Sequence, residues 1–272
     1  MELMKSALKR GFPRTYNRLR ECKYAMTSRM FSPYTVKHTY GGHGFEVHIV
    51  DSLARGWYDR DWERLDEINM LGANGLRGGC LVFDLGAHQN VVAMMWAKEV
   101  GPSGTVISVE ASRHNFEVGR RNVSLNGFAN IITLHAVVAE TEGQELFSQT
   151  LNGCVSIDEG EFRAKPVRAI TIDGLAKEFG SPDILFLDIE GYEIAALKGA
   201  SETLKAQATW FIEVHGNAIL SEYGSWNADI FQFFQAPYEY YYRTEEKGPF
   251  VRLESKDAIP ESRFFLAAVP RR

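Results

Sequence analysis

Six residues that could take part in catalysis or ligand binding each follow a short apolar run. They are Asp84, Glu110, Asp188, Glu190, Glu213 and His215. Such runs are typical of buried strands in an α/β sheet, and these sheets bind ligands at the carboxyl ends of their parallel strands. Carboxylates accept hydrogen bonds from hydroxyl and ammonium groups, and a carboxylate or an imidazole can take up a proton from a reacting alcohol. The pattern therefore predicts one crevice suited to ligand binding and acid–base chemistry.

The elements that would position the first two acids form a βαβ unit over residues 81–110. An apolar run at 81–83 ends at Asp84, a turn follows at Gly86, residues 91–96 have helical periodicity, and a strand at 105–109 ends at Glu110. The turn lacks the further glycines of a dinucleotide fingerprint, which disfavours a diphosphate cofactor and a nicotinamide dehydrogenase. One tight turn and two carboxylates suit a cofactor without phosphate, namely adenosine joined to an amino acid. The alternative is an ordinary βαβ turn.

The rest of the chain continues the alternation of strands and helices. Further strands are predicted at 131–138, 184–187 and 210–212, and a helix at 194–204. Residues 141–169 are polar and predict an inserted hairpin or loop where a crossover helix would otherwise stand. A helix near 230–234 and strands at 238–242 and 264–269 predict a closing antiparallel hairpin. The pattern indicates an α/β fold with a Rossmann-like, doubly wound sheet.

The composition predicts a globular, cytoplasmic protein. The 272 residues are 45% hydrophobic and 24% charged. No apolar run reaches the roughly 18 residues that span a bilayer, and no secretory signal is evident. A formal net charge of −5 argues against nucleic-acid binding. The three cysteines, Cys22, Cys80 and Cys154, have the spacing of neither a disulfide framework nor a zinc knuckle.

An extension is predicted at residues 1–78, before a catalytic-type domain at 79–272. Residues 1–29 are basic, with interspersed apolar side chains. They predict a helical arm that docks on its own domain or contacts anionic lipid, an acidic partner or a second subunit in a homo-oligomer. Residues 35–50 predict a hairpin. The aromatic and acidic segment from Trp57 to Trp62 predicts either a lid over the cofactor or the start of a surface helix.

Four short motifs in this order resemble the FkbM family of class I S-adenosylmethionine-dependent methyltransferases. They are the segment at 82–90 (VFDLGAHQN), the acid Glu110, the segment at 188–191 (DIEG) and the segment at 213–215 (EVH). The resemblance spans residues 81–215. It implies a seven-stranded sheet with an antiparallel last strand, S-adenosylmethionine as cofactor, and methyl transfer to a hydroxyl of a sugar or natural-product-type small molecule. The residues that it assigns to cofactor binding are Asp84, Gly86, Ala87, His88, Glu110, Ala111 and Asp188.

Three residues depart from the family's pattern. His88 replaces an Asn, Asn90 replaces a Gly, and Phe186 replaces a common Lys. We expect His88 to border the cofactor pocket and the Asn90 side chain to lie beside the cofactor's approach path. These departures leave open the alternative of a non-catalytic binding or scaffold protein with a methyltransferase fold.

The resemblance and the chemistry together assign catalytic roles to His215, Asp188, Glu213 and Glu190. His215 is the predicted base because an unperturbed imidazole has a pKa near neutrality; the alternative is a histidine that only forms a structural hydrogen bond. Asp188 would hold the cofactor's ammonium or the acceptor's hydroxyl, and Glu190 would fix the turn. The preferred hypothesis has no metal. A variant of it places a divalent ion between Asp188, Glu213 and His215.

Overall fold

The computed structural model describes residues 30–148, 153–156, 164–234, 237–255 and 259–271. The predicted basic arm at 1–29 lies outside the described residues.

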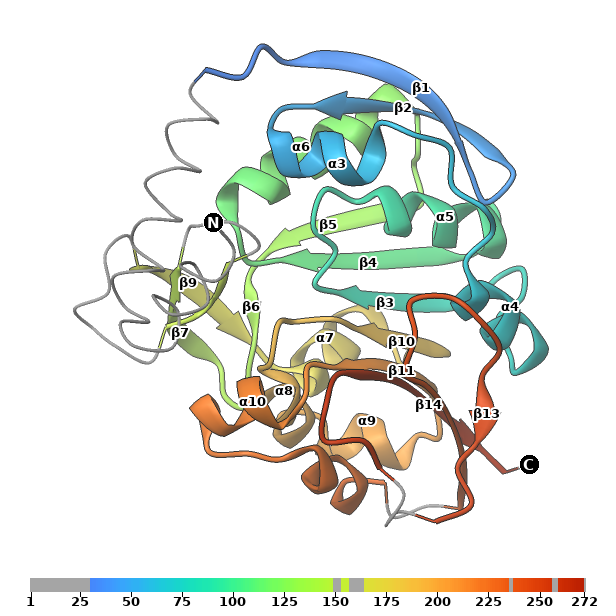
Figure 1. The fold of residues 1–272 in the computed structure, drawn as a ribbon, viewed down its shortest axis with the longest axis vertical. Coiled ribbons are helices and arrows are strands. Elements are labelled where there is room, and N and C mark those ends of the chain that lie inside the picture. The colour runs from blue at the N-terminus through green and yellow to red at the C-terminus, as the bar shows by residue number, and fades with distance from the viewer. Residues whose placement is uncertain (1–29, 149–152, 157–163, 235–236, 256–258, 272) are drawn as a thin grey trace, which may run out of the picture.

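An eight-stranded central sheet carries the fold (Figure 1). Across the sheet the strands are β13 (Val251–Arg252), β12 (Tyr238–Arg243), β14 (Phe264–Pro270), β11 (Thr209–Val214), β10 (Ile184–Leu187), β3 (Leu81–Leu85), β4 (Thr105–Glu110) and β5 (Ile131–His135). The five strands from β11 to β5 are parallel, and β14 runs antiparallel between β11 and β12. The predicted doubly wound sheet and closing hairpin are confirmed. The predicted count of seven strands is one too low, because the two-residue β13 pairs with β12 at the edge as an eighth strand.

The helices are α3 (Ser52–Tyr58), α4 (Asp66–Ala73), α5 (Val91–Val100), α6 (Arg113–Leu125), α7 (Ile172–Phe179), α8 (Glu193–Lys198), α9 (Ser201–Lys205) and α10 (Asn217–Leu220), with 3-10 turns η1 (Ser221–Tyr223) and η2 (Asn227–Gln232). Two apolar cores cover opposite faces of the sheet because side chains alternate along a strand. Phe83 and Leu85 pack in the core that contains residues of α7, α8 and α9. Val82 and Ile184 pack in the core that contains α5 and residues 40–76.

The predicted N-terminal hairpin is present as β1 (Tyr34–Tyr40) and β2 (His43–Ile49). It lies beside α6 (Figure 1), where the backbone N–H of His48 donates to Oδ1 of Asn122 at 2.8 Å. At the opposite edge of the sheet, Arg243 of β12 pairs with Glu67 of α4 at 2.5 Å. Residues 30–78 therefore share a core with the sheet, and the domain boundary at residue 79 stays a prediction.

The third predicted strand is divided between two sheets. Only residues 131–135 continue in the central sheet, and β6 (Val137–Val138) joins a second sheet of order β6-β9-β7-β8. Its other strands are β7 (Gly143–Ser148), β8 (Cys154–Val155) and β9 (Ala164–Ile170), and β7 and β9 form the predicted inserted hairpin. Because β5 is an edge strand, the chain that follows it is free to pair with β9.

Two predicted helices differ from those observed. The helix expected at 194–204 is divided into α8 and α9 at Gly199, where an added Cβ would lie 2.3 Å from the carbonyl oxygen of Ala139. The helix expected at 230–234 is the 3-10 turn η2.

Candidate active site

The turn after β3 joins the ends of three neighbouring strands. The backbone N–H groups of Gly86 and Ala87 both donate to the carbonyl oxygen of Val109, at 2.9 and 3.0 Å. Gly86 has φ +98°, and a Cβ on it would lie 1.7 Å from the carbonyl oxygen of Asp188. Only glycine allows β3 and β10 to approach this closely. The sequence therefore places a glycine here for backbone packing as well as for access to a ligand.

Asp84 is almost completely buried just before this turn, with 1% of its surface exposed. Its Oδ2 has no hydrogen-bond partner among the described residues. Burial raises the pKa of this carboxyl to about 7. An unsatisfied buried oxygen is costly, so a ligand that donates to it would gain binding free energy.

Glu110 at the end of β4 holds the turn and faces a pocket. Its Oε2 accepts a hydrogen bond from the backbone N–H of His88 at 2.8 Å, and its Oε1 accepts one from the N–H of Ser112 at 2.6 Å. Burial raises the pKa of Glu110 to about 8. Each carboxylate oxygen has a second lone pair, so the side chain can still accept hydrogen bonds from a ligand.

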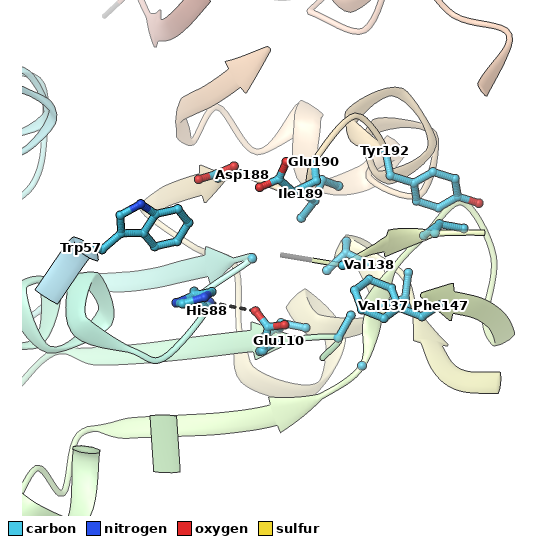
Figure 2. Close-up of a pocket in the computed structure, with 16 residues that line it drawn as sticks. Trp57, His88, Glu110, Val137, Val138, Phe147, Asp188, Ile189, Glu190 and Tyr192 are labelled. Carbon is cyan, nitrogen blue, oxygen red and sulfur yellow. Dashed lines mark hydrogen bonds between the residues drawn. The ribbon is translucent and has the colours of Figure 1, made fainter. Parts of the chain in front are cut away.

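A pocket of about 640 Å³, including its open mouth, lies against this turn (Figure 2). We call it the cofactor pocket, after the role predicted from the sequence for the residues that line it. Its polar lining includes His88, Glu110, Asp188 and Glu190, with Gly86 and Ala111 between them. Its apolar wall consists of Val109, Ala136, Val137, Val138, Phe147 and Val155. The sequence analysis missed the part of this wall that comes from the inserted sheet. The only sequence feature that could have indicated this part of the wall was the apolar end of the strand predicted at 131–138.

His88 borders the pocket beside two aromatic rings of α3. Its Nδ1 lies 2.7 Å from the hydroxyl oxygen of Tyr58, and its ring centroid is 5.0 Å from that of Trp57. Burial lowers the pKa of His88 to about 4. The segment from Trp57 to Trp62 was predicted as a lid or as the start of a surface helix. Its first two residues are the last two of α3, and Trp57 forms part of the pocket wall.

Asn90 does not lie where the sequence analysis expected. Its backbone is left-handed, with φ +63°, and its Oδ1 accepts a hydrogen bond from the Ser108 hydroxyl. Its side chain packs toward Gly119 of α6, and it lines neither of the two pockets described here. The expected position beside the cofactor's approach path is therefore wrong, because the left-handed turn directs the side chain between β4 and α6.

Replacing His88 by Asn should remove one source of acid sensitivity. The unfolded chain protonates His88 near pH 6.5, whereas the folded chain does so near pH 4, so lowering the pH through this window favours unfolding. Between pH 8 and pH 5 we expect the wild type to lose about 2 kcal/mol more unfolding free energy than His88→Asn. Urea unfolding of both proteins at several pH values measures this difference. Parallel pH profiles would contradict the assignment of a buried, neutral His88.

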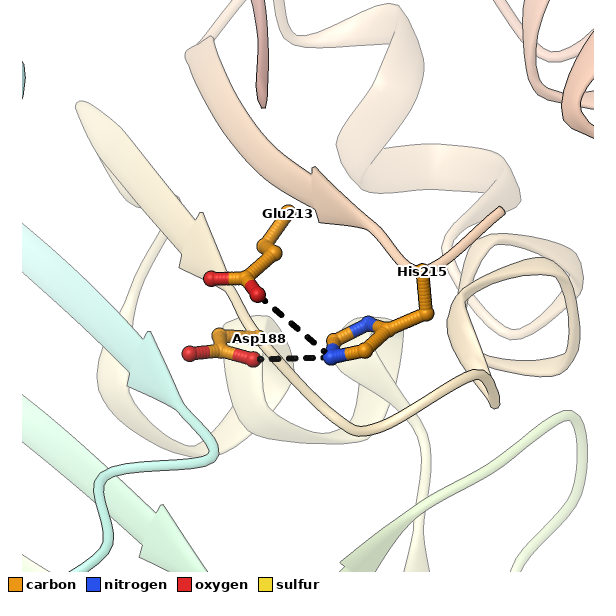
Figure 3. A group of neighbouring side chains, drawn as sticks. All are labelled: Asp188, Glu213 and His215. Carbon is orange, nitrogen blue, oxygen red and sulfur yellow. Dashed lines mark ion pairs between the residues drawn. The ribbon is translucent and has the colours of Figure 1, made fainter. Parts of the chain in front are cut away.

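A second cluster lies where β10 and β11 end (Figure 3). His215 Nε2 lies 3.4 Å from Glu190, 3.5 Å from Glu213 and 3.7 Å from Asp188, in each case measured to a carboxylate oxygen. On the other side of the ring, Nδ1 lies 2.8 Å from Oε1 of Glu193. The structure thus brings together all four predicted catalytic residues.

Glu193 and Arg263 belong to this cluster and were missed from the sequence. Glu193 is fully buried, and its Oε1 also accepts from the backbone N–H of Gly191 at 2.9 Å. Arg263 donates from Nε to Oε1 of Glu213 and pairs with Glu246 at 2.6 Å. Glu193 stands two residues after a recognisable motif, but no signal marked Arg263.

The near-neutral pKa on which the base assignment of His215 relied is not retained. Burial alone would lower this pKa, but hydrogen bonds to Glu190 and Glu193 and the negative charges around the ring outweigh it and raise the pKa to about 11. The pKa of Asp188 is raised by burial and by Glu213. With only these side chains present, the ring therefore carries the proton. The assignment of His215 as the base stays a prediction.

A larger groove adjoins the cofactor pocket; we call it the acceptor groove, after the sequence-based prediction that Asp188 holds the acceptor's hydroxyl. Trp57, Gly86, His88, Asp188 and Glu190 line both. The groove is also lined by Asp84, Ala87, Phe186, Glu213 and His215, and by charged residues of the α3–α4 connection. The two spaces thus meet at the carboxyl ends of β3 and β10. All the predicted site residues line one or the other.

The Methyltransferase FkbM domain model matches residues 84–243, which is more than half of the chain. The chain belongs to this family. Membership confirms the predicted methyltransferase class and makes S-adenosylmethionine the methyl donor. The match covers the strands and turns that form the cofactor pocket, together with the cluster at the ends of β10 and β11. The preceding hairpin and α3 lie outside it.

Several solved methyltransferase structures resemble this one. An S-adenosylmethionine-dependent O-methyltransferase from Thermotoga maritima is 12% identical, with a TM-score of 0.45 over 88% of this chain and 78% of that one. Aeropyrum pernix fibrillarin with natively bound S-adenosylmethionine is 13% identical, with a TM-score of 0.46 over 86% and 82%. Precorrin-6y C5,15-methyltransferase from Geobacter metallireducens is 12% identical, with a TM-score of 0.43 over 77% and 89%. Such similarity identifies no substrate. The search of curated proteins found no match.

Among the described residues, no helix has the length and apolar character needed to cross a membrane.

Proposed function

We propose that this methyltransferase methylates a hydroxyl group of a small, polar molecule such as a sugar or a natural product. The observation that carries the proposal is the junction of the cofactor pocket and the acceptor groove at Asp188 and Glu190. A methyl donor in the first space and a hydroxyl in the second would meet beside three carboxylates and an imidazole.

The residues of the cofactor pocket fit S-adenosylmethionine. The apolar wall suits an adenine ring, and Glu110 at the end of β4 stands where an acid can accept hydrogen bonds from ribose hydroxyls. Where the pocket meets the groove, the unsatisfied oxygen of Asp84 and the carboxylate of Asp188 suit the cofactor's ammonium. When bound, the cofactor supplies an electrophilic methyl group, so the chain needs no nucleophile of its own.

The acceptor groove suits a ligand with several hydroxyl groups. Its charged lining residues include Arg60, Asp61, Glu63, Glu246, Lys247 and Arg263. The whole lining holds nine carboxylates and four Lys or Arg side chains, so hydrogen-bond acceptors for ligand hydroxyl groups predominate. The carboxylates around His215 add oxygen atoms that can take up the proton lost by an attacking hydroxyl. Positioning and proton removal are the contributions we assign to these side chains.

One of the two sequence departures that supported a non-catalytic scaffold does not lie at the site. The scaffold alternative rested on His88 and Asn90, and the Asn90 side chain lies away from the pocket. His88 lines both spaces at their junction. We therefore retain the enzymatic function.

A mass-spectrometric screen tests the proposal. The full chain is incubated with S-adenosylmethionine and pools of hydroxylated sugars, glycosides, phenols and lipids, and products heavier by one methylene are fragmented to locate the methyl group. We expect an alkali-stable ether. A product methylated on a carboxylate or an amine, or cofactor binding without turnover in any pool, would overturn it.

Replacing Glu110 by Ala should weaken the binding of S-adenosylmethionine by about 1 to 3 kcal/mol, the usual scale for loss of a buried hydrogen-bond partner. Titration calorimetry measures the affinity. Glu117→Ala is the matched control, because Glu117 forms an exposed ion pair with Arg113 on α6, outside both pockets. Parent-like affinity in Glu110→Ala would refute the ribose assignment. Thermal unfolding of the variant shows whether the turn survives without the bonds to His88 and Ser112.

A further inference from the structure

The cluster at the ends of β10 and β11 has the donor set of a divalent metal site. One ligand atom each from Asp188, Glu213 and His215 lies within 4.8 Å of the others. Atoms that share one cation at about 2.1 Å lie about 3 Å apart when adjacent and about 4 Å apart when opposite. Small side-chain rotations would therefore bring these three atoms onto one ion.

The ring of His215 is held in the orientation that a metal ligand needs. Glu193 accepts from Nδ1 at 2.8 Å, which leaves the Nε2 lone pair of a neutral ring facing the carboxylates of Asp188, Glu213 and Glu190. Metal-binding histidines commonly donate their other ring N–H to a carboxylate in this way. Glu193 is itself fixed by the N–H of Gly191, so the orientation of the ring does not depend on a flexible partner.

Two buried acids that line or adjoin the cluster each have a carboxylate oxygen whose burial is not offset by a hydrogen bond. Oε2 of Glu193, which is fully buried, has no hydrogen-bond partner among the described residues. The same holds for Oδ2 of Asp84, which lines the same groove. Buried carboxylates are normally paired or coordinate a metal. Arg263 offsets part of the charge from the side of Glu213, but it also pairs with Glu246.

We infer that Asp188, Glu213 and His215 bind one divalent cation of the Mn²⁺ or Mg²⁺ type, with Glu193 orienting the histidine. Two carboxylates and a single imidazole favour these ions over zinc, whose sites are richer in histidine or cysteine. All three residues line the acceptor groove. There the ion would bind the acceptor's hydroxyl oxygen and make its proton easier to lose. This role rests on the proposed function, whereas binding of the ion does not.

Calorimetric titration of Mn²⁺ into the chelator-treated full chain, without cofactor or acceptor, tests the site. We expect one Mn²⁺ per chain in the wild type and no measurable binding in Asp188→Asn or Glu213→Gln. Glu193→Gln should bind about 10- to 100-fold more weakly, the usual cost of losing the partner that orients a ligand. Glu202→Gln is the matched control: it changes an exposed acid that pairs with Lys205, outside both pockets, and it should bind as the parent does.

Thermal unfolding of the wild type tests the same site without relying on whether any variant folds. Mn²⁺ should raise the Tm of the wild type, and added chelator should reverse the rise. A wild type that shows neither heat nor a shift with Mn²⁺, Mg²⁺ or Zn²⁺ overturns the proposal, as does binding that persists unchanged in both ligand variants. Because no methyl transfer is measured, an error in the proposed acceptor class leaves this result intact.

Discussion

Asp188→Asn is expected to lower turnover at least about 100-fold, the lower end of what a positioned acid–base group contributes. Asp188 stands at the junction of the cofactor pocket and the acceptor groove, 3.7 Å from Nε2 of His215. Asparagine keeps the shape of the side chain and the backbone contact with Gly86, but it carries no negative charge and takes up no proton. Affinity for S-adenosylmethionine should therefore change less than turnover.

The measurement uses an acceptor found in the screen, with turnover at saturating cofactor and affinity by calorimetry. Glu140→Gln serves as the control because Glu140 is exposed, forms an ion pair with Lys198 and lines neither pocket. Unchanged turnover in Asp188→Asn would refute the acceptor-side assignment. A loss confined to cofactor affinity would instead make Asp188 a ligand of the cofactor alone.

Gly86→Ala should lower the unfolding free energy by at least about 3 kcal/mol, the sum of left-handed strain and overpacking. Its Cβ would lie 1.7 Å from the carbonyl oxygen of Asp188, which is backbone and cannot rotate away. Relief requires separating β3 from β10, and these are central strands of the sheet.

Two control variants separate the causes. Gly42 also has a positive φ, +90°, but an added Cβ there has no neighbour within 4 Å, so Gly42→Ala measures strain alone. Gly56 lies within α3, also with no neighbour within 4 Å, and Gly56→Ala should be neutral or stabilising. Denaturant unfolding compares all three. A loss in Gly86→Ala no larger than that in Gly42→Ala would show that the approach of β10 is not the limiting contact.

The sequence alone determined the order of the main strands, the glycine turn and the acids at the strand ends. A strand or a turn restricts which residue types can follow one another in the chain, so these features are visible as local periodicity and short motifs. The same locality explains the confirmed hairpins at β1–β2 and β7–β9, since each joins segments close in the chain.

Only the tertiary structure decided which residues complete the site. The wall formed by Val137, Phe147 and Val155 depends on a second sheet packing beside the first, and Arg263 reaches Glu213 across 50 residues of chain. Asn90 occupies a motif position, yet its left-handed backbone directs the side chain to Ser108. The pKa of His215 likewise depends on carboxylates that follow β10 and on one from α8. Tertiary packing sets these positions. Contacts between segments far apart in the chain produce no local periodicity, so the sequence did not predict them.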